Sequence, residues 1–172
     1  MARTEVIPNT KPLGSPGYQK GVVTTHVSLA MGLEPGVAPL DAAWAHQLVF
    51  PESHFFELRY GQQPGWPAPP GGKNLQFFVS GRPEWQGALK PGEWQNFAIT
   101  VDYDKKIVTL YTSTGGGALQ KRAEVPRVSS TSRSDLHIGA LRLPMAGGRQ
   151  LQRPTSIYYS NLWIEAGPPS GL

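Results

Sequence analysis

The stretch WQNFAITVDYDKKIVTLYT, residues 94–112, carries the clearest indication of the fold class of this chain. Its apolar residues Phe97, Ile99 and Val101 recur with the period of two that is typical of a strand with one buried face. Polar residues interrupt the pattern at 102–106, before a second run rich in β-branched residues. The stretch therefore predicts a β-hairpin whose first strand points Phe97, Ile99 and Val101 into the core.

Similar runs recur on both sides of this hairpin, separated by loops rich in the 20 glycines and 17 prolines of the chain. Strands are expected at 22–29, 44–50, 55–60, 75–79, 136–143 and 157–164. Short strands with long connections and no helical period predict an all-β fold, an antiparallel two-sheet β-sandwich of the jelly-roll type. Within 44–50, strict alternation would place His46, Leu48 and Phe50 on one face of the sheet.

The composition excludes several classes of function. The 172 residues include no cysteine, so neither a disulfide framework nor a thiolate zinc site can form. The net charge of +4 comes from scattered lysines and arginines rather than from a basic run, so we expect no nucleic-acid partner. No apolar run approaches the ~18 residues of a membrane span, so we expect no membrane partner. The four histidines lack the close paired spacing of a zinc site, and we expect neither a metal nor another cofactor.

Two glutamates beside strand-like patterns are candidates for acid/base chemistry. Cleavage of a glycosidic bond typically needs two carboxyl groups, one to protonate the leaving oxygen and one to activate water or attack the sugar. Glu5 is two positions from Arg3, so on a strand both side chains would leave the same face, where the cation would favour an ionised carboxylate. Glu52 follows an apolar strand across Pro51. A surface ion pair and a loop glutamate are the simpler interpretations of the two residues.

Other candidates are a histidine in a strand and aromatic residues in loops. His137 lies inside an apolar run and would orient a catalytic carboxylate or share its proton. Trp66 and Trp85 are surrounded by glycines, prolines and polar residues, and an indole held out in such a loop suits the C–H face of a sugar ring. Arg3 and Gln47 complete the predicted substrate-binding set. By contrast, Trp94 and Trp163 lie in apolar strands, where an indole is normally buried.

Five segments, in this order along the chain, resemble the fungal glycoside hydrolase family 131. They are RTEVIP at 3–8, AWAHQLVFPES at 43–53, WQNFAITVD at 94–102, LHIGAL at 136–141 and IYYSNLWIE at 157–165. The third segment alone is common to many lectin-like sandwiches, whereas five segments in order are considerably more specific. The resemblance thus spans nearly the whole chain.

The resemblance implies a β-jelly roll that acts on fungal and plant β-glucans with broad tolerance for linkage type. Residue by residue, Glu5 and Glu52 match the two proposed catalytic glutamates of the family, and His137 matches an associated histidine. The expected activity is hydrolysis of β-1,3/1,6 and/or β-1,4 glucosidic bonds, with a β-glucan polysaccharide or oligosaccharide as partner. The resemblance also implies a secreted, extracellular fungal protein.

Two features depart from the family pattern. Pro51 precedes Glu52, and His46 stands where the family has a tyrosine. Family members also carry substantial sequence before the Arg-x-Glu strand. We therefore expect residues 1–172 to be a single catalytic domain that is N-terminally incomplete, with an exposed apolar strip beside 3–6, low solubility and weak activity at best.

Two alternative functions remain open. In a non-catalytic carbohydrate-binding module, the loop tryptophans would hold sugar while Glu5 and Glu52 would only bind hydroxyl groups. A jelly-roll polysaccharide lyase would need cations to neutralise a uronate and a basic residue, and its candidates are Arg3, Arg59, Arg142 and His137.

Overall fold

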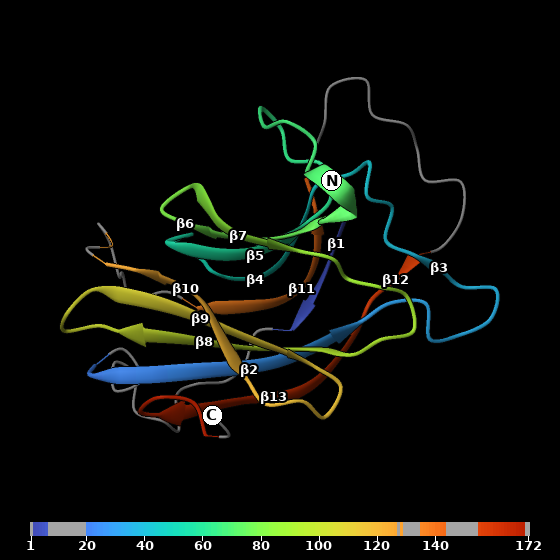
Figure 1. Ribbon diagram of the computed structural model, residues 1–172. Helices are drawn as coiled ribbons and strands as arrows, with labels where there is room; N and C mark the ends of the chain where they lie inside the picture. Colours follow the sequence, from blue (N-terminus) through green and yellow to red (C-terminus); the bar gives the residue numbers. More distant parts are fainter. Residues whose placement is uncertain (1, 7–19, 127, 129–134, 144–154, 171–172) are drawn as a thin grey trace.

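The computed structural model of the protein describes residues 2–6, 20–126, 128, 135–143 and 155–170, and within 2–6 it describes the backbone and the Thr4 side chain. Two antiparallel sheets face each other as two layers (Figure 1). The six-stranded sheet has the order β1 (Ala2–Val6), β11 (Leu136–Arg142), β4 (His46–Pro51), β5 (Phe56–Tyr60), β6 (Leu75–Val79), β7 (Arg82–Gly87). The five-stranded sheet has the order β10 (Gln120–Val125), β9 (Ile107–Thr114), β8 (Gln95–Asp102), β2 (Val22–Ala30), β13 (Tyr158–Ala166).

The remaining regular elements are short. A parallel pair joins β3 (Ala38–Pro39) to β12 (Thr155–Ser156), and a single 3-10 turn covers Pro70–Gly72. None of the helical segments in the described ranges is long and apolar enough to cross a membrane. The architecture confirms the predicted antiparallel two-sheet sandwich of the jelly-roll type.

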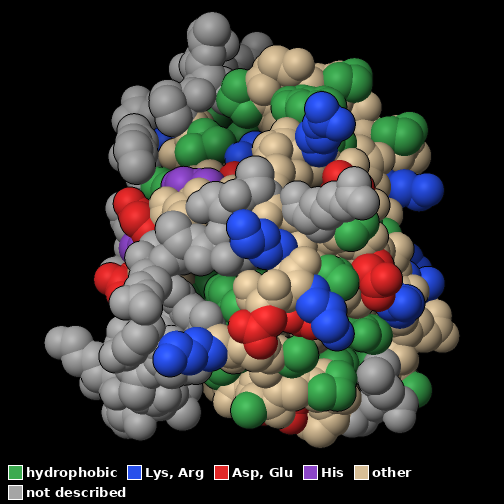
Figure 2. All heavy atoms as spheres, turned by 90° about the vertical axis from the view of Figure 1, so that its left-hand side faces the viewer, with side chains coloured by type: hydrophobic (Ala, Val, Ile, Leu, Met, Phe, Trp, Pro, Cys, Tyr) green, Lys and Arg blue, Asp and Glu red, His purple; other side chains and the backbone are tan. Residues whose placement is uncertain are grey.

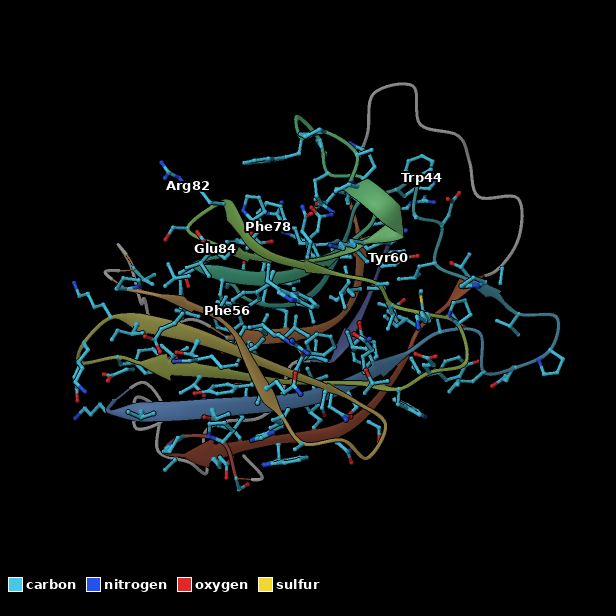
Figure 3. The ribbon with its side chains drawn as sticks, viewed as in Figure 1. Trp44, Phe56, Tyr60, Phe78, Arg82 and Glu84 are labelled. Carbon is cyan, nitrogen blue, oxygen red and sulfur yellow. The ribbon has the colours of Figure 1, made fainter. Side chains whose placement is uncertain are left out.

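The hairpin predicted within residues 94–112 is β8–β9, and it lies in the middle of the five-stranded sheet. Phe97, Ile99 and Val101 are buried in the common core, as predicted. Their core neighbours come from the alternate positions of the opposite sheet, such as Leu58 and Phe77. Figure 3 shows Phe56 pointing from β5 into the space between the two layers, whereas Phe78 of β6 lies on the outer side of the six-stranded sheet.

Two expectations about side-chain direction are wrong. In β4, the pairing register with β5 shifts between Gln47 and Val49, and both Leu48 and Val49 are packed in the core. This bulge breaks the strict alternation predicted for 44–50, so Phe50 does not share the face of Leu48. Trp163 is 44% exposed rather than buried, because it lies in the edge strand β13 beside a second register shift.

His46, at the first position of β4, is buried, and we expect it to make the protein sensitive to acid. Burial lowers the pKa of His46 to about 4. The unfolded chain would take up a proton below about pH 6.5, whereas the folded protein would not do so until about pH 4. Stability is therefore lost as the pH falls through this window, by about 3 kcal/mol from this group alone.

Guanidinium denaturation at about pH 7 and about pH 4 checks this prediction by comparing the wild-type protein with His46→Gln. The variant is expected to lose less of its unfolding free energy between the two pH values, because glutamine does not titrate. Equal losses in both proteins would contradict the assignment of this acid sensitivity to His46.

Candidate functional site

The outer face of the six-stranded sheet carries polar side chains that are nonetheless buried. Gln47, Glu57, Gln76 and His137 all belong to this group. They alternate along their strands with core residues, so they leave the side of the sheet that faces away from the sandwich interior. Burial of polar groups is costly unless they are hydrogen-bonded, so their partners show how this surface is organised.

Glu57 is the centre of a hydrogen-bond network on this face. Its side chain is only 3% exposed, and it accepts from Nε and Nη2 of Arg59 at 2.9 and 2.5 Å. The amide Nε2 of Gln47 donates to the same carboxylate from the neighbouring strand. Nδ1 of His54 lies 3.5 Å from Glu57 Oε2. These contacts hold the Glu57 carboxylate in one orientation between β4 and β5.

Glu52 and His137 form a carboxylate–imidazole pair on the same face of the sheet. His137 Nε2 lies 2.8 Å from Glu52 Oε2. The two side chains differ in access to solvent, because His137 is buried whereas the Glu52 side chain is 63% exposed. The pair therefore presents a reachable carboxyl group on a fixed imidazole, an arrangement that can exchange a proton with a bound molecule.

The ring of Phe50 lies between the two histidines that contact Glu52 and Glu57. Its ring stacks on His137 and on His54, each at 5.0 Å between ring centroids with planes 9° apart. His137 contacts Glu52, and His54 contacts Glu57, so the rings form a bridge between the two acidic side chains. Phe50 is itself buried, which keeps this bridge rigid.

The other predicted glutamate belongs to the adjacent edge strand. Glu5 pairs with Gly139 in the β1–β11 register, and Arg3 pairs with Leu141. The side chains of Arg3 and Glu5 lie outside the described residues, so their contacts stay a prediction. The register nevertheless brings position 5 to within two residues of His137 along β11, the strand that separates β1 from β4.

Trp66 lies over this face, as a loop residue that is 40% exposed. Its ring meets Phe78 edge-on at 5.9 Å, and the guanidinium of Arg59 lies 4.4 Å from the centre of the same Phe78 ring. Gln62 Nε2 donates to the Trp66 carbonyl at 2.6 Å. Gly61 begins this loop with φ +85°, where any Cβ would collide with the Trp44 carbonyl oxygen. This tight turn helps to bring Trp66 over the sheet.

Trp85 does not lie in a loop, contrary to the prediction. It belongs to β7 and packs against the core, with its ring 6.3 Å from that of Phe97 in the opposite sheet. It also lines a cavity of about 360 Å³ between the sheet edges, together with Gln95 and Arg122. Its contact with substrate stays a prediction, and its ring packs toward the core rather than over the outer face of the six-stranded sheet.

The structure brings Glu52, His137, Gln47 and Trp66 to one sheet face. It also places there Glu57 and His54, which the sequence interpretation missed, and it pairs Arg59, considered there only as a lyase cation, with Glu57. Glu57 and Arg59 are two positions apart in a strand of alternating pattern, so their side chains leave the same face. This spacing is the feature of the sequence from which the ion pair could have been predicted. His54 follows the strand at a left-handed backbone position, φ 54°. Its place beside Glu57 depends on the turn between β4 and β5, which the sequence pattern did not reveal.

Charge is mixed on the face of the molecule drawn in Figure 2. Figure 2 shows acidic and basic side chains interspersed on one face of the molecule, rather than gathered by sign. Among the residues that the structure describes, no group of three or more histidines and acidic residues is placed to hold a metal ion.

Comparison with known proteins gave a matching family model and similar solved structures. Residues 1–169 match the family model described as the glycoside hydrolase 131 catalytic N-terminal domain. Two solved structures resemble the chain over 98% of its length: a GH131 β-glucanase catalytic domain from Podospora anserina, with 30% identity and a TM-score of 0.82, and the catalytic domain of a glycoside hydrolase family 131 protein from Coprinopsis cinerea, with 34% identity and a TM-score of 0.78.

The match covers only part of each solved structure. The chain spans 66% of the Podospora anserina domain and 64% of the Coprinopsis cinerea domain, just under two thirds of their length. No curated protein matches the sequence.

Proposed function

Because this chain belongs to glycoside hydrolase family 131, we propose that it hydrolyses β-glucosidic bonds of β-glucans on the outer face of its six-stranded sheet. The observation that carries the proposal is the Glu52–His137 pair, an accessible carboxyl group held at 2.8 Å by a buried imidazole. Glycoside hydrolysis requires a carboxyl group in such a position, within reach of the sugar yet fixed in direction.

Glu5 is the second carboxyl group of the proposed reaction. It lies on β1, the strand next to β11, at the position that pairs with Gly139, two residues along β11 from His137. In the proposed reaction, one of the two glutamates protonates the glycosidic oxygen as its bond to the sugar breaks. The other accepts a proton from the attacking water, or first attacks the sugar itself.

The Glu57 network has a supporting role in this proposal. Its carboxylate already accepts three hydrogen bonds from Arg59 and Gln47 and is shielded from solvent, so it is poorly placed to exchange protons with a substrate. Through His54 and Phe50 it instead fixes the position of His137. Trp66 would supply the flat surface on which a glucose ring rests at the edge of this site.

The substrate in this proposal is a neutral glucan. Arg59, one of the cations that a uronate-cleaving lyase would need, is paired with Glu57. The linkages that we propose are β-1,3/1,6 and/or β-1,4. The exposed indole of Trp66 would contact the glucose ring rather than the glycosidic linkage, so it would not distinguish one linkage from another. Polymeric β-glucan does not cross a membrane, so we place the activity outside the cell.

An assay of product chemistry tests the proposal. The 172-residue protein is incubated separately with a β-1,3/1,6-glucan, a β-1,4-glucan and a uronate polymer. We expect new reducing ends from at least one neutral glucan and no ultraviolet absorbance of unsaturated ends from the uronate. Unsaturated products would instead indicate a lyase, and glucan binding without reducing ends would indicate a binding module.

A further inference from the structure

The five-stranded sheet has its own exposed aromatic platform on its outer face, on the opposite side of the sandwich from Glu52. Trp163 of β13 stacks on the ring of His26 of β2, with 4.1 Å between centroids and planes 10° apart. His26 is buried, and its Nε2 lies 2.6 Å from Glu165 Oε1. One face of the indole is therefore fixed against the protein, and the exposed part of the ring is available to a ligand.

A strand irregularity holds Trp163 in this position. The pairing of β13 with β2 runs Ser160 to Ser28 and then Trp163 to His26, so β13 has one more residue than its partner in this interval. Asn161, inside this irregularity, has φ 49°, a conformation that asparagine tolerates better than most residues. Irregularities of this kind redirect side chains and are frequent beside binding sites.

Uncharged polar side chains surround the platform. Asn161 Nδ2 donates to Ser28 Oγ at 3.1 Å, and Ser28 donates to Asn96 Oδ1 at 2.6 Å. Asn96 in turn donates to Ser113 Oγ at 2.9 Å. Together with Trp163, these residues line a hollow of about 230 Å³. The row is preorganised, because each member is already oriented by its neighbour.

The hollow retains hydrogen-bonding capacity for a ligand. Among the residues that the structure describes, the indole N–H of Trp163 has no hydrogen-bond partner, and the same holds for Asn161 Oδ1. A donor, an acceptor and a flat apolar surface thus lie within three residues of one another. This combination matches a sugar ring, whose hydroxyl groups surround an apolar C–H face.

We propose that Trp163, Asn161 and the Ser28–Asn96–Ser113 row form a second glycan-binding site that is separate from the hydrolytic face. Its ligand is a neutral polysaccharide, because none of these five side chains is charged. The identification of that polysaccharide as β-glucan rests on the proposed function. A site on the opposite sheet would keep the protein on a polymer while bonds are cleaved elsewhere, and thereby raise the local concentration of substrate.

Native affinity electrophoresis with soluble β-glucan in the gel tests the site. The parent protein carries Glu52→Gln so that the glucan in the gel stays intact. Adding Trp163→Ala is expected to weaken glucan binding about tenfold, because the platform is lost. Trp163→Phe keeps a ring but loses the N–H, and is expected to fall between the parent and the alanine variant.

Leu162→Ala is the matched control, because Leu162 is the exposed apolar neighbour of Trp163 in the same irregularity, 40% exposed against 44%. We expect it to bind glucan like the parent. Equal binding by the Trp163→Ala variant and the parent would overturn the proposal, as would equal weakening by Leu162→Ala. A change confined to self-association in sedimentation would also overturn it, since it would identify a contact between copies of this chain.

The failure of this inference can be distinguished from failure of the proposed function. In a chain with Glu52 intact, Trp163→Ala should leave the cleavage rate of a short soluble oligosaccharide unchanged while lowering the rate on insoluble glucan. If the chain cleaves nothing but still binds glucan in a Trp163-dependent way, the second site stands and the proposed hydrolysis is wrong.

Discussion

Replacing Glu52 by glutamine is expected to lower the turnover of β-glucan by a factor of about 10²–10⁴, the usual contribution of general acid–base catalysis. Glutamine preserves the size of the side chain and can still hydrogen-bond to His137, but it cannot donate or accept the catalytic proton. The Glu52 side chain is 63% exposed, so its replacement removes little buried contact. We therefore expect the thermal midpoint to stay within a few degrees of that of the wild-type protein.

Initial rates of reducing-end release, measured together with thermal unfolding, check this expectation. Glu34→Gln is the control, because Glu34 is an exposed glutamate in a turn outside both sheets. It should retain the wild-type rate. Glu5→Gln should show a loss of the same order as Glu52→Gln, since both carboxyl groups take part in the proposed reaction. Wild-type rates in both Glu5→Gln and Glu52→Gln would refute the assignment of the catalytic pair.

Replacing Glu57 by glutamine should instead affect stability. The change leaves the guanidinium of Arg59 without its anion on a largely buried surface, and removal of one partner from a buried ion pair typically costs 3–5 kcal/mol. Arg59 keeps some contact with solvent, so we expect a loss of about 3 kcal/mol in the free energy of unfolding. Guanidinium denaturation at neutral pH measures it.

Two further variants separate this buried pair from an ordinary surface pair. Glu57→Gln combined with Arg59→Met removes both charges and should recover much of the lost stability. Glu124→Gln breaks the exposed pair of Glu124 with Lys121 and should leave the denaturation midpoint unchanged. A Glu57→Gln protein as stable as the wild type would show that the network contributes no net stability.

Measured together, the effects on stability and on activity would distinguish the role of Glu52 from that of Glu57. Glu52 is expected to affect rate without stability, whereas Glu57 is expected to affect stability first and rate through the position of His137. His54 and Phe50 provide the physical link between them. A Glu57→Gln protein that is stable but inactive would instead place Glu57 among the reacting groups.

The sequence alone was sufficient to predict the two-sheet fold, because the period of two in 94–112 is a local property of the chain. Phe97, Ile99 and Val101 are in the core for that reason. The family motifs are also local in the sequence, and two of them contain the candidates Glu52 and His137. The two side chains lie 2.8 Å apart in the structure, and their shared role in catalysis stays a prediction.

Tertiary structure decided the features that depend on which strands are neighbours and in what register. The bulge after Gln47 puts Leu48 and Val49 in the core together, and the irregularity before Trp163 leaves an apolar-strand tryptophan exposed. The Glu57 network likewise joins residues of β4, β5 and their connecting turn. Alternation along one strand predicts which face a side chain leaves, but only cross-strand pairing determines what it meets there, since those partners are distant in sequence.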